Sequence, residues 1–144
     1  MKINIKTKVN QPYQQVFAQF DQALFKALAP PFPRVKLLKY DGSKVGDWVI
    51  IQLNFLFFKQ VWESEIVEAE EQTGEIYFID EGRQLPFFLK YWRHRHRVVA
   101  ADHQSFIIDE ITYKTPFALL DWLMYPLMYG QFLYRKPIYK KKFR

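Results

Sequence analysis

The sequence predicts an α+β fold in which a seven-stranded antiparallel sheet wraps around a long C-terminal helix, with one or two short helices after the first strand. Three observations lead to this prediction. A strand-like segment opens the chain, six strand-like segments separated by turn residues fill residues 34–114, and an amphipathic helical segment follows them. Consecutive strands joined by short turns pair antiparallel, and a sheet with one face in water needs amphipathic elements on its other face.

The first strand, residues 2–10, alternates polar residues with apolar or β-branched ones. A helical segment follows, because Pro12 suits the start of a helix and apolar residues recur at helical spacing up to Leu28. The prolines of residues 30–33 end this segment, since proline cannot continue a helix. The pattern fits either one helix or two short helices arranged in a V. The strand residues expected to face inward are Ile3, Ile5, Thr7 and Val9.

Six further strands are expected, because runs rich in β-branched and aromatic residues alternate with turn residues. Their bounds are residues 35–40, 47–55, 59–70, 75–81, 91–101 and 104–114. Thr115-Pro116 opens the final helix, which carries an apolar stripe and which Pro126 should kink. No repeat or low-complexity linker interrupts this order, so residues 1–144 are expected to form a single domain.

Composition limits the classes of function. The chain has 144 residues, of which 49% are hydrophobic and 19% aromatic, so its core is either very dense or lines a ligand cavity. It contains no cysteine, which excludes a disulfide framework and a thiolate metal site. The N-terminus lacks the continuous apolar run of a signal peptide, and polar residues and a proline interrupt residues 117–134. We therefore expect a soluble, cytoplasmic protein.

The net charge of +6 is concentrated in two basic clusters, at residues 90–97 and at Arg135–Arg144. An acidic stretch, residues 63–81, opposes them. A surface with separate basic and acidic regions argues against a nucleic-acid partner. The C-terminal cluster could contact an anionic membrane, although cations at a solvated helix end are the commoner arrangement.

The segment Trp92-Arg93-His94-Arg95-His96-Arg97 predicts which way the sheet faces. Side chains alternate between the two faces of a strand, so the three arginines share one face and the tryptophan and both histidines share the other. Burying three unpaired guanidinium groups would cost far more free energy than burying two neutral imidazoles. The tryptophan and the histidines are therefore expected to point inward.

A two-residue turn at Asp102-His103 sets the register between this strand and the next. In that register His96 faces Asp109 on the inner side of the sheet. On the outer side Arg95 faces Glu110, as a cross-strand ion pair.

The same alternation is applied to the preceding hairpin. The residues assigned to water are Glu63, Glu65 and Asp80. The residues assigned to the interior are Trp62, Ser64, Ile66, Tyr77 and Ile79. An aromatic interior with a few polar groups is typical of ligand pockets. The residues expected to contact a ligand are Trp62, Tyr77, Trp92, His94, His96, Tyr113, Met124 and Met128.

The order of elements, together with two segments, resembles the START-like superfamily, also called SRPBCC or helix-grip. Phe88-Leu89-Lys90-Tyr91-Trp92-Arg93-His94-Arg95-His96-Arg97-Val98 is similar to the Trp-x-His-x-His strand of its bacterial ligand-binding or cyclase-like members, and residues 109–117 extend the match. Leu85 departs from the glycine expected before Pro86-Phe87. The resemblance implies a pocket between sheet and C-terminal helix for lipids, polyketides or other apolar ligands. It also implies two possible roles, since some members catalyse cyclisation, dehydration or hydrolysis and many only bind.

Two kinds of chemistry are conceivable at the inward histidines. His96 and Asp109 could form a general acid/base pair, but we favour the simpler interpretation of a buried polar pair at one end of the pocket. A metal held by His94 and His96 would need a third ligand, for which Asp109 is the one candidate, so no metal site is expected.

We therefore expect a protein that binds or carries a small hydrophobic molecule of the lipid, polyketide or aromatic type, without a cofactor. A cyclase, dehydratase or hydrolase that uses His96 and Asp109 is the second hypothesis. Contact with an anionic membrane through Arg135–Arg144 is the third. The sequence has neither a glycine-rich phosphate loop nor a Gly-x-Ser-x-Gly motif, which argues against nucleotide-dependent and serine-hydrolase activities.

Overall fold

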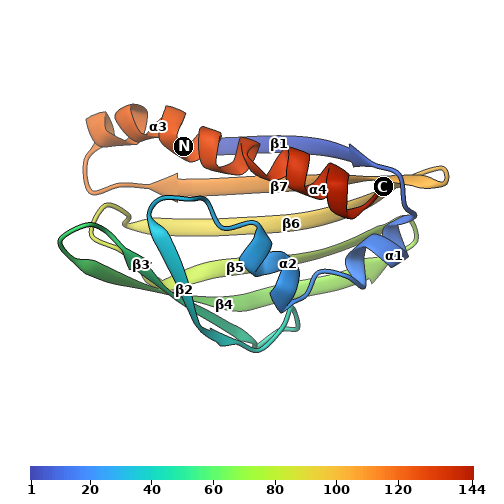
Figure 1. Ribbon diagram of the computed structural model, residues 1–144, viewed down its shortest axis with the longest axis horizontal. Helices are drawn as coiled ribbons and strands as arrows, with labels where there is room; N and C mark the ends of the chain where they lie inside the picture. The colour runs from blue at the N-terminus through green and yellow to red at the C-terminus, as the bar shows by residue number, and fades with distance from the viewer.

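The structure is a computed structural model that describes residues 1–144 (Figure 1). Seven strands and four helices follow one another in the predicted order, and each strand bound lies within about three residues of its prediction. In chain order the elements are β1 (Lys2–Val9), α1 (Tyr13–Phe17), α2 (Gln22–Ala27), β2 (Arg34–Tyr40), β3 (Trp48–Asn54), β4 (Lys59–Gln72), β5 (Glu75–Gln84), β6 (Tyr91–Ala101), β7 (Gln104–Lys114), α3 (Ala118–Leu133) and α4 (Arg135–Lys142).

All seven strands belong to one antiparallel sheet, in the order β1-β7-β6-β5-β4-β3-β2. The sheet curves around α2 and α4, which lie in front of it in Figure 1. The first strand of the chain pairs with the last, so β1 and β2 form the two edges of the sheet. The prediction of a seven-stranded sheet that grips a C-terminal helix is confirmed.

The segment after β1 forms two short helices. The carboxylate of Asp21 accepts a hydrogen bond from the Leu24 backbone N–H at 2.9 Å, which caps the start of α2. This cap separates α2 from α1 and resolves the choice between one helix and two.

The C-terminal helix is divided into α3 and α4 at Tyr134. Helix α3 runs through Pro126, where the sequence predicted a kink. The division lies three residues before Pro137, which has no N–H to donate to the carbonyl four residues earlier. Pro137 therefore accounts for the position of the division better than Pro126 does.

The register between β6 and β7 is the predicted one. Ala101 pairs with Gln104 across the turn, and His96 pairs with Asp109. Trp92 and His94 are buried on the inner face of the sheet, as the alternation of strand residues requires.

The outer face of β6 differs from the prediction in one ion pair. Glu110 lies opposite Arg95, but its carboxylate accepts a hydrogen bond from Arg97 at 2.8 Å. The Arg95 guanidinium lies over the ring of Tyr77, 4.3 Å from its centroid. Glu110 thus pairs with Arg97, its diagonal neighbour, because a long arginine side chain reaches the adjacent position on the next strand.

The predicted orientation of β5 is wrong. A β-bulge in β4, between Ile66 and Glu68, inserts one extra residue and reverses the alternation beyond it. Asp80, which was assigned to water, pairs with Ile66 and points inward. Tyr77 was assigned to the interior, but it lies on the outer face with Ile79, and its hydroxyl donates to Glu68 at 2.7 Å.

Two clusters of buried apolar residues hold the helices on the concave face. One lies between α3 and β1, β6 and β7, and includes Trp92, Tyr113 and Phe132. The other joins α1, α2 and α4 to the sheet, and includes Val16 and Tyr139. None of the helices is both long enough and apolar enough to cross a lipid bilayer.

Candidate functional site

A cavity of about 470 Å³ lies between the concave face of the sheet and the helices. Of its 32 lining residues, 22 are hydrophobic, which makes it a predominantly apolar space. Its walls are built by α2 and the proline-rich segment after it, by the inward side chains of β2–β6, and by one face of α3. The cavity has the size and composition of a small-molecule site.

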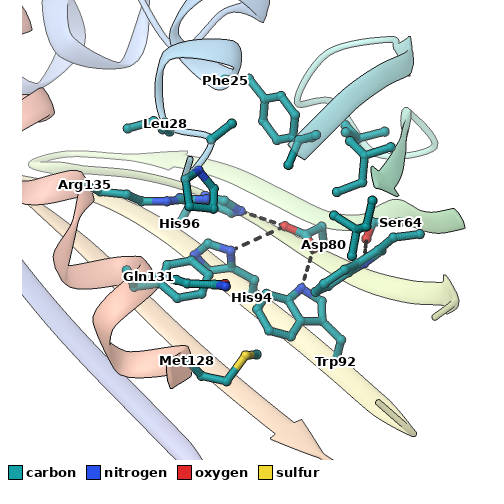
Figure 2. A pocket seen from close by; sticks show the side chains of 18 of the residues that line it. Phe25, Leu28, Ser64, Asp80, Trp92, His94, His96, Met128, Gln131 and Arg135 are labelled. Carbon is teal, nitrogen blue, oxygen red and sulfur yellow. Dashed lines mark hydrogen bonds and ion pairs between the residues drawn. The ribbon is translucent and has the colours of Figure 1, made fainter. Parts of the chain in front are cut away.

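The polar groups of the cavity gather at one end, around the carboxylate of Asp80 on β5 (Figure 2). Asp80 Oδ2 lies 2.6 Å from His96 Nε2 and 3.9 Å from His94 Nδ1. Its other oxygen, Oδ1, accepts a hydrogen bond from Trp92 Nε1 at 3.1 Å. One carboxylate thus faces three side chains of β6.

His94 has a second carboxylate behind it. Its Nε2 lies 2.9 Å from Asp109 Oδ1, and both side chains are almost completely buried. Asp109 is in turn approached by Arg135 of α4, with Nη1 at 3.5 Å from Oδ1. The resulting chain of polar contacts runs from Arg135 through Asp109 and His94 to Asp80.

The predicted pair of His96 and Asp109 is therefore not formed. The two residues are opposite each other in the register, yet the Asp109 carboxylate bonds to His94 and His96 bonds to Asp80. Each histidine has its own carboxylate. The prediction failed because it did not include Asp80 among the inward residues. Regular alternation had assigned Asp80 to water, but the bulge in β4 interrupts that alternation.

Burial and neighbouring charges determine the protonation of this end. Burial and, to a smaller extent, the nearby His96 lower the pKa of His94 to about 4, against the raising effect of Asp109. Burial would raise the pKa of Asp80, but the hydrogen bond and charge of His96 outweigh it, so this pKa is below its usual value. The pKa of Asp109 is lowered against its burial by the hydrogen bond with His94 and the charge of Arg135. At neutral pH His94 is thus neutral and both carboxylates are ionised.

Four of the predicted ligand-contacting residues form an apolar wall beside this polar end. Trp62 and Trp92 meet edge to face with ring centroids 4.7 Å apart, and Met124 and Met128 approach from α3. Trp62 Nε1 donates to Ser64 Oγ at 3.0 Å, which satisfies its one polar group inside the cavity. His94 and His96 also line the cavity, as predicted.

The other two predicted contacts lie elsewhere. Tyr77 is on the outer face of the sheet. Tyr113 does point inward, but it is fully buried in the core beneath α3, where its hydroxyl donates to the Asp121 carbonyl at 2.9 Å.

Two functional candidates were missed by sequence reasoning, namely Asp80 and Arg135. Asp80 follows four consecutive apolar or aromatic residues, Ile76–Ile79. Polar and apolar residues do not alternate there, so the strand itself does not indicate which face points inward. Arg135 was assigned to the exposed basic C-terminus, whereas its side chain is 15% exposed and lines the cavity. The apolar residues of α2 and of its C-cap that line the cavity, Leu24, Phe25 and Leu28, did have a signal in their helical spacing.

No protein-family model and no curated protein matches the chain. Solved structures do match, at low sequence identity. Norcoclaurine synthase from Thalictrum flavum has a TM-score of 0.67 and 13% identity, over 98% of this chain and 92% of the synthase. An aromatase/cyclase from a Streptomyces species has a TM-score of 0.65 and 11% identity, over 96% of this chain and 90% of that one. A Mycobacterium smegmatis protein has a TM-score of 0.70 and 14% identity, over 99% of this chain and 90% of that protein. The chain therefore has the same fold as these proteins, a curved antiparallel sheet that grips a C-terminal helix.

Proposed function

We propose that this protein binds or carries a small, largely apolar molecule in the cavity between its sheet and its C-terminal helices. The observation that carries the proposal is the cavity itself, about 470 Å³ of mainly hydrophobic space with a single polar end. Protein interiors normally pack closely and keep few voids larger than a water molecule. A space of this size inside a domain of 144 residues is well suited to a ligand.

The lining indicates what kind of molecule fits. Aromatic and methionine side chains cover most of the wall, and they adapt to flat or irregular apolar shapes. The polar end offers carboxylates, an imidazole and the Arg135 guanidinium, which suit a ligand with one hydroxyl, carbonyl or acidic group. The polar group would lie against Asp80, His96 and Arg135, and the apolar body would lie along the two tryptophans.

The proposal can be tested by filling the cavity with a side chain. Ile51 and Ile50 are neighbours on β3, but only Ile51 lines the cavity. In Ile51→Trp the indole should occupy the space, so the affinity for anilinonaphthalene sulfonate, a fluorescent apolar probe, should fall by at least about tenfold. Ile50→Trp adds the same side chain outside the cavity and should leave the affinity unchanged. Fluorescence titration measures both, with a chelator present so that no metal contributes.

Native mass spectrometry of the freshly purified protein would show whether an apolar compound is retained, and its mass would identify the class. Equal probe affinity in wild type, Ile51→Trp and Ile50→Trp would contradict the proposal, because the probe would then bind elsewhere.

A second candidate function is catalysis of a proton transfer on the bound molecule. The observation that favours it is the 2.6 Å contact between His96 Nε2 and Asp80 Oδ2 at the wall of the cavity. A carboxylate that orients an imidazole towards a substrate is a common acid/base arrangement. Two proteins of similar fold are named as a synthase and as an aromatase/cyclase, so the fold accommodates enzymes.

This candidate can be tested without knowing the substrate. Acetophenone in heavy water exchanges its methyl protons slowly unless a base removes them, and proton NMR follows the exchange. If His96 acts as a base, wild type should accelerate the exchange and His96→Ala should abolish the acceleration. His96→Asn should retain probe binding but not exchange. An acceleration that persists in His96→Ala would remove His96 from the chemistry.

A further inference from the structure

We propose that Asp80, His94 and His96 form a binding site for a divalent transition-metal ion at the polar end of the cavity. Each residue offers one ligand atom, and these atoms all lie within 4.8 Å of one another. The residues come from the paired strands β5 and β6, where Asp80 is opposite His94 in the register. Adjacent strands hold the three side chains in a fixed relation, as a metal site requires.

The distances suit one shared ion. Asp80 Oδ2 lies 2.6 Å from His96 Nε2 and 3.9 Å from His94 Nδ1. Nitrogen and oxygen ligands that each lie about 2.0–2.2 Å from a zinc ion are separated from one another by roughly 3–3.5 Å. Small rotations of these side chains would therefore place the three atoms around one ion, which would replace the hydrogen bond between Asp80 and His96.

The outer contacts orient His94 for this role. Its Nε2 is held by Asp109 Oδ1 at 2.9 Å. Its Nδ1 is thereby directed towards Asp80, as Figure 2 shows. Metal-binding histidines almost always bond a carboxylate or carbonyl through their second ring nitrogen. Asp109 is fixed in turn by Arg135, with Nη1 at 3.5 Å from Oδ1. Asp109 is therefore a positioning residue for the site.

The charge balance of the cavity also favours a cation. Asp80 and Asp109 bring two formal negative charges, while Arg135 brings one positive charge. Buried charges are paired or coordinate metals, because leaving one uncompensated costs much free energy. Two imidazoles and one carboxylate are the ligands that Zn²⁺, Fe²⁺ or Co²⁺ prefer over Mg²⁺ and Ca²⁺. The remaining coordination positions would face the cavity, where a ligand oxygen or water could enter.

The test uses Co²⁺ and Zn²⁺ alone, on protein first stripped with a chelator and then freed of it. We expect one Co²⁺ per chain by isothermal titration calorimetry, together with visible absorption bands of a low-symmetry site. Asp80→Asn and His96→Ala should weaken binding by at least about 100-fold, and Asp109→Asn by about 10–100-fold. His103→Ala is the matched control, because this turn histidine is exposed and far along the hairpin from the cluster.

A second measurement does not depend on whether these variants fold. The chain has three histidines, so an NMR spectrum of the imidazoles of wild type is simple. Adding Zn²⁺ should shift the signals of His94 and His96 and leave His103 in place. A response confined to His103, equal binding of Mg²⁺, or unchanged Co²⁺ affinity in Asp80→Asn and His96→Ala would overturn the proposal. No organic ligand is involved, so this failure would leave the proposed cavity function untouched.

An independent observation concerns the end of the sheet where β1 and β6 begin, on the left of Figure 1. Three separate turns there expose apolar tips, with Phe57 94%, Phe87 63% and Phe117 71% exposed. Trp122 follows Phe117 by five residues, in the first turns of α3, and is 69% exposed. We infer that this end inserts shallowly into a lipid bilayer.

The charges around these turns match a membrane surface. Lys59 follows the first turn, Lys90 follows the second and Lys114 precedes the third, and all three are exposed. The acidic side chain nearest to the third turn, Asp121, is occupied by hydrogen bonds from Thr115 at 2.6 Å. Aromatic side chains flanked by lysines are typical of the membrane interface.

The same end leads to the cavity. Phe55, which lines the cavity, stacks on Phe58 of the first exposed turn with ring centroids 4.8 Å apart. The basic residues Lys140, Lys141 and Lys142 lie at the opposite end, where the Phe143 carbonyl accepts from the Asn10 N–H at 3.0 Å. The structure thus favours the aromatic end over the basic C-terminus as the membrane contact.

Vesicle sedimentation tests this second proposal. Wild type should sediment with phosphatidylcholine vesicles containing about one third phosphatidylglycerol. The double variant Phe57→Ser/Phe87→Ser should lose most of this binding. The control Lys140→Gln/Lys141→Gln/Lys142→Gln removes three positive charges from the opposite end and should retain the vesicle binding. Equal binding of wild type and the double variant would overturn the inference. So would concentration-dependent dimers that the double variant disperses without any vesicle binding, because a second copy would then cover the patch.

Discussion

At the scale of single residues, His94 couples the stability of the protein to pH. Its imidazole is 3% exposed and lies between two carboxylates, yet burial keeps it neutral. A neutral imidazole carries one N–H, and the ionised carboxylates can only accept. Nε2, which lies 2.9 Å from Asp109 Oδ1, therefore holds the proton, and Nδ1 turns its lone pair towards Asp80, 3.9 Å away.

The first prediction follows from that neutrality. The pKa of His94 falls from 6.5 to about 4 on folding, so between these values the unfolded chain binds more protons than the folded one. Stability should therefore decrease as the pH is lowered through this range, by up to roughly 3 kcal/mol. The lowered pKa values of Asp80 and Asp109 act in the same direction at still lower pH, because their ionised forms stabilise the fold.

Urea denaturation of the metal-free protein, at about pH 7 and about pH 4.5, measures the effect. His103→Ala should show the same loss, because that histidine is outside the buried cluster. Equal free energies of unfolding at both pH values would mean that His94 is protonated in the folded protein.

At the scale of elements, the bulge in β4 decides which chemistry the cavity contains. Without the extra residue, Ile66 and the residues before it would lie on the other face of the sheet. With it, the inward face of β4 carries Trp62 and Ser64, and the inward face of β5 carries Asp80. A local departure from regular pairing thus provides the carboxylate on which the polar end depends.

Helix α2 is the element whose local stability is easiest to test. It is six residues long and forms one wall of the cavity, so it depends on its cap and its packing. Asp21→Ala removes the acceptor for the Leu24 N–H and should lower the free energy of unfolding by about 1 kcal/mol. Asp21→Asn keeps an oxygen acceptor and should retain most of the stability. Identical urea midpoints for Asp21→Ala and wild type would show that α2 does not need the cap.

At the scale of the whole molecule, the cavity divides the interior into two packed regions. Trp92 and Phe132 line it from one buried cluster, while Leu24 and Tyr139 line it from the other. A ligand that fills the space would contact both clusters and would link the packing of one to the packing of the other.

Ligand binding should accordingly stabilise the fold as a unit. A ligand present at a hundred times its dissociation constant adds about 2.7 kcal/mol to the free energy of unfolding. For a domain of this size that corresponds to an increase in Tm of about 5–10 °C. Differential scanning calorimetry with anilinonaphthalene sulfonate measures the shift, which should be much smaller in Ile51→Trp. Tight probe binding without any increase in Tm would place the probe on the unfolded chain as well.

The sequence by itself determined the order of the elements, the seven-stranded sheet and the register of β6 with β7. These features depend on local information: turn residues, period-two alternation and the cost of burying arginine. The inward orientation of Trp92, His94 and His96 followed from the same reasoning and is present in the structure.

Tertiary structure alone decided which groups meet at the polar end. Asp80 points inward because of an extra residue on a neighbouring strand, and Arg135 arrives from a helix that is distant in the chain. Two imidazoles two residues apart both lie within reach of the same carboxylates, so only the three-dimensional arrangement selects the pairs His96 with Asp80 and His94 with Asp109. Alternation along one strand cannot supply this information, because hydrogen-bond partners are chosen across strands by distance and burial.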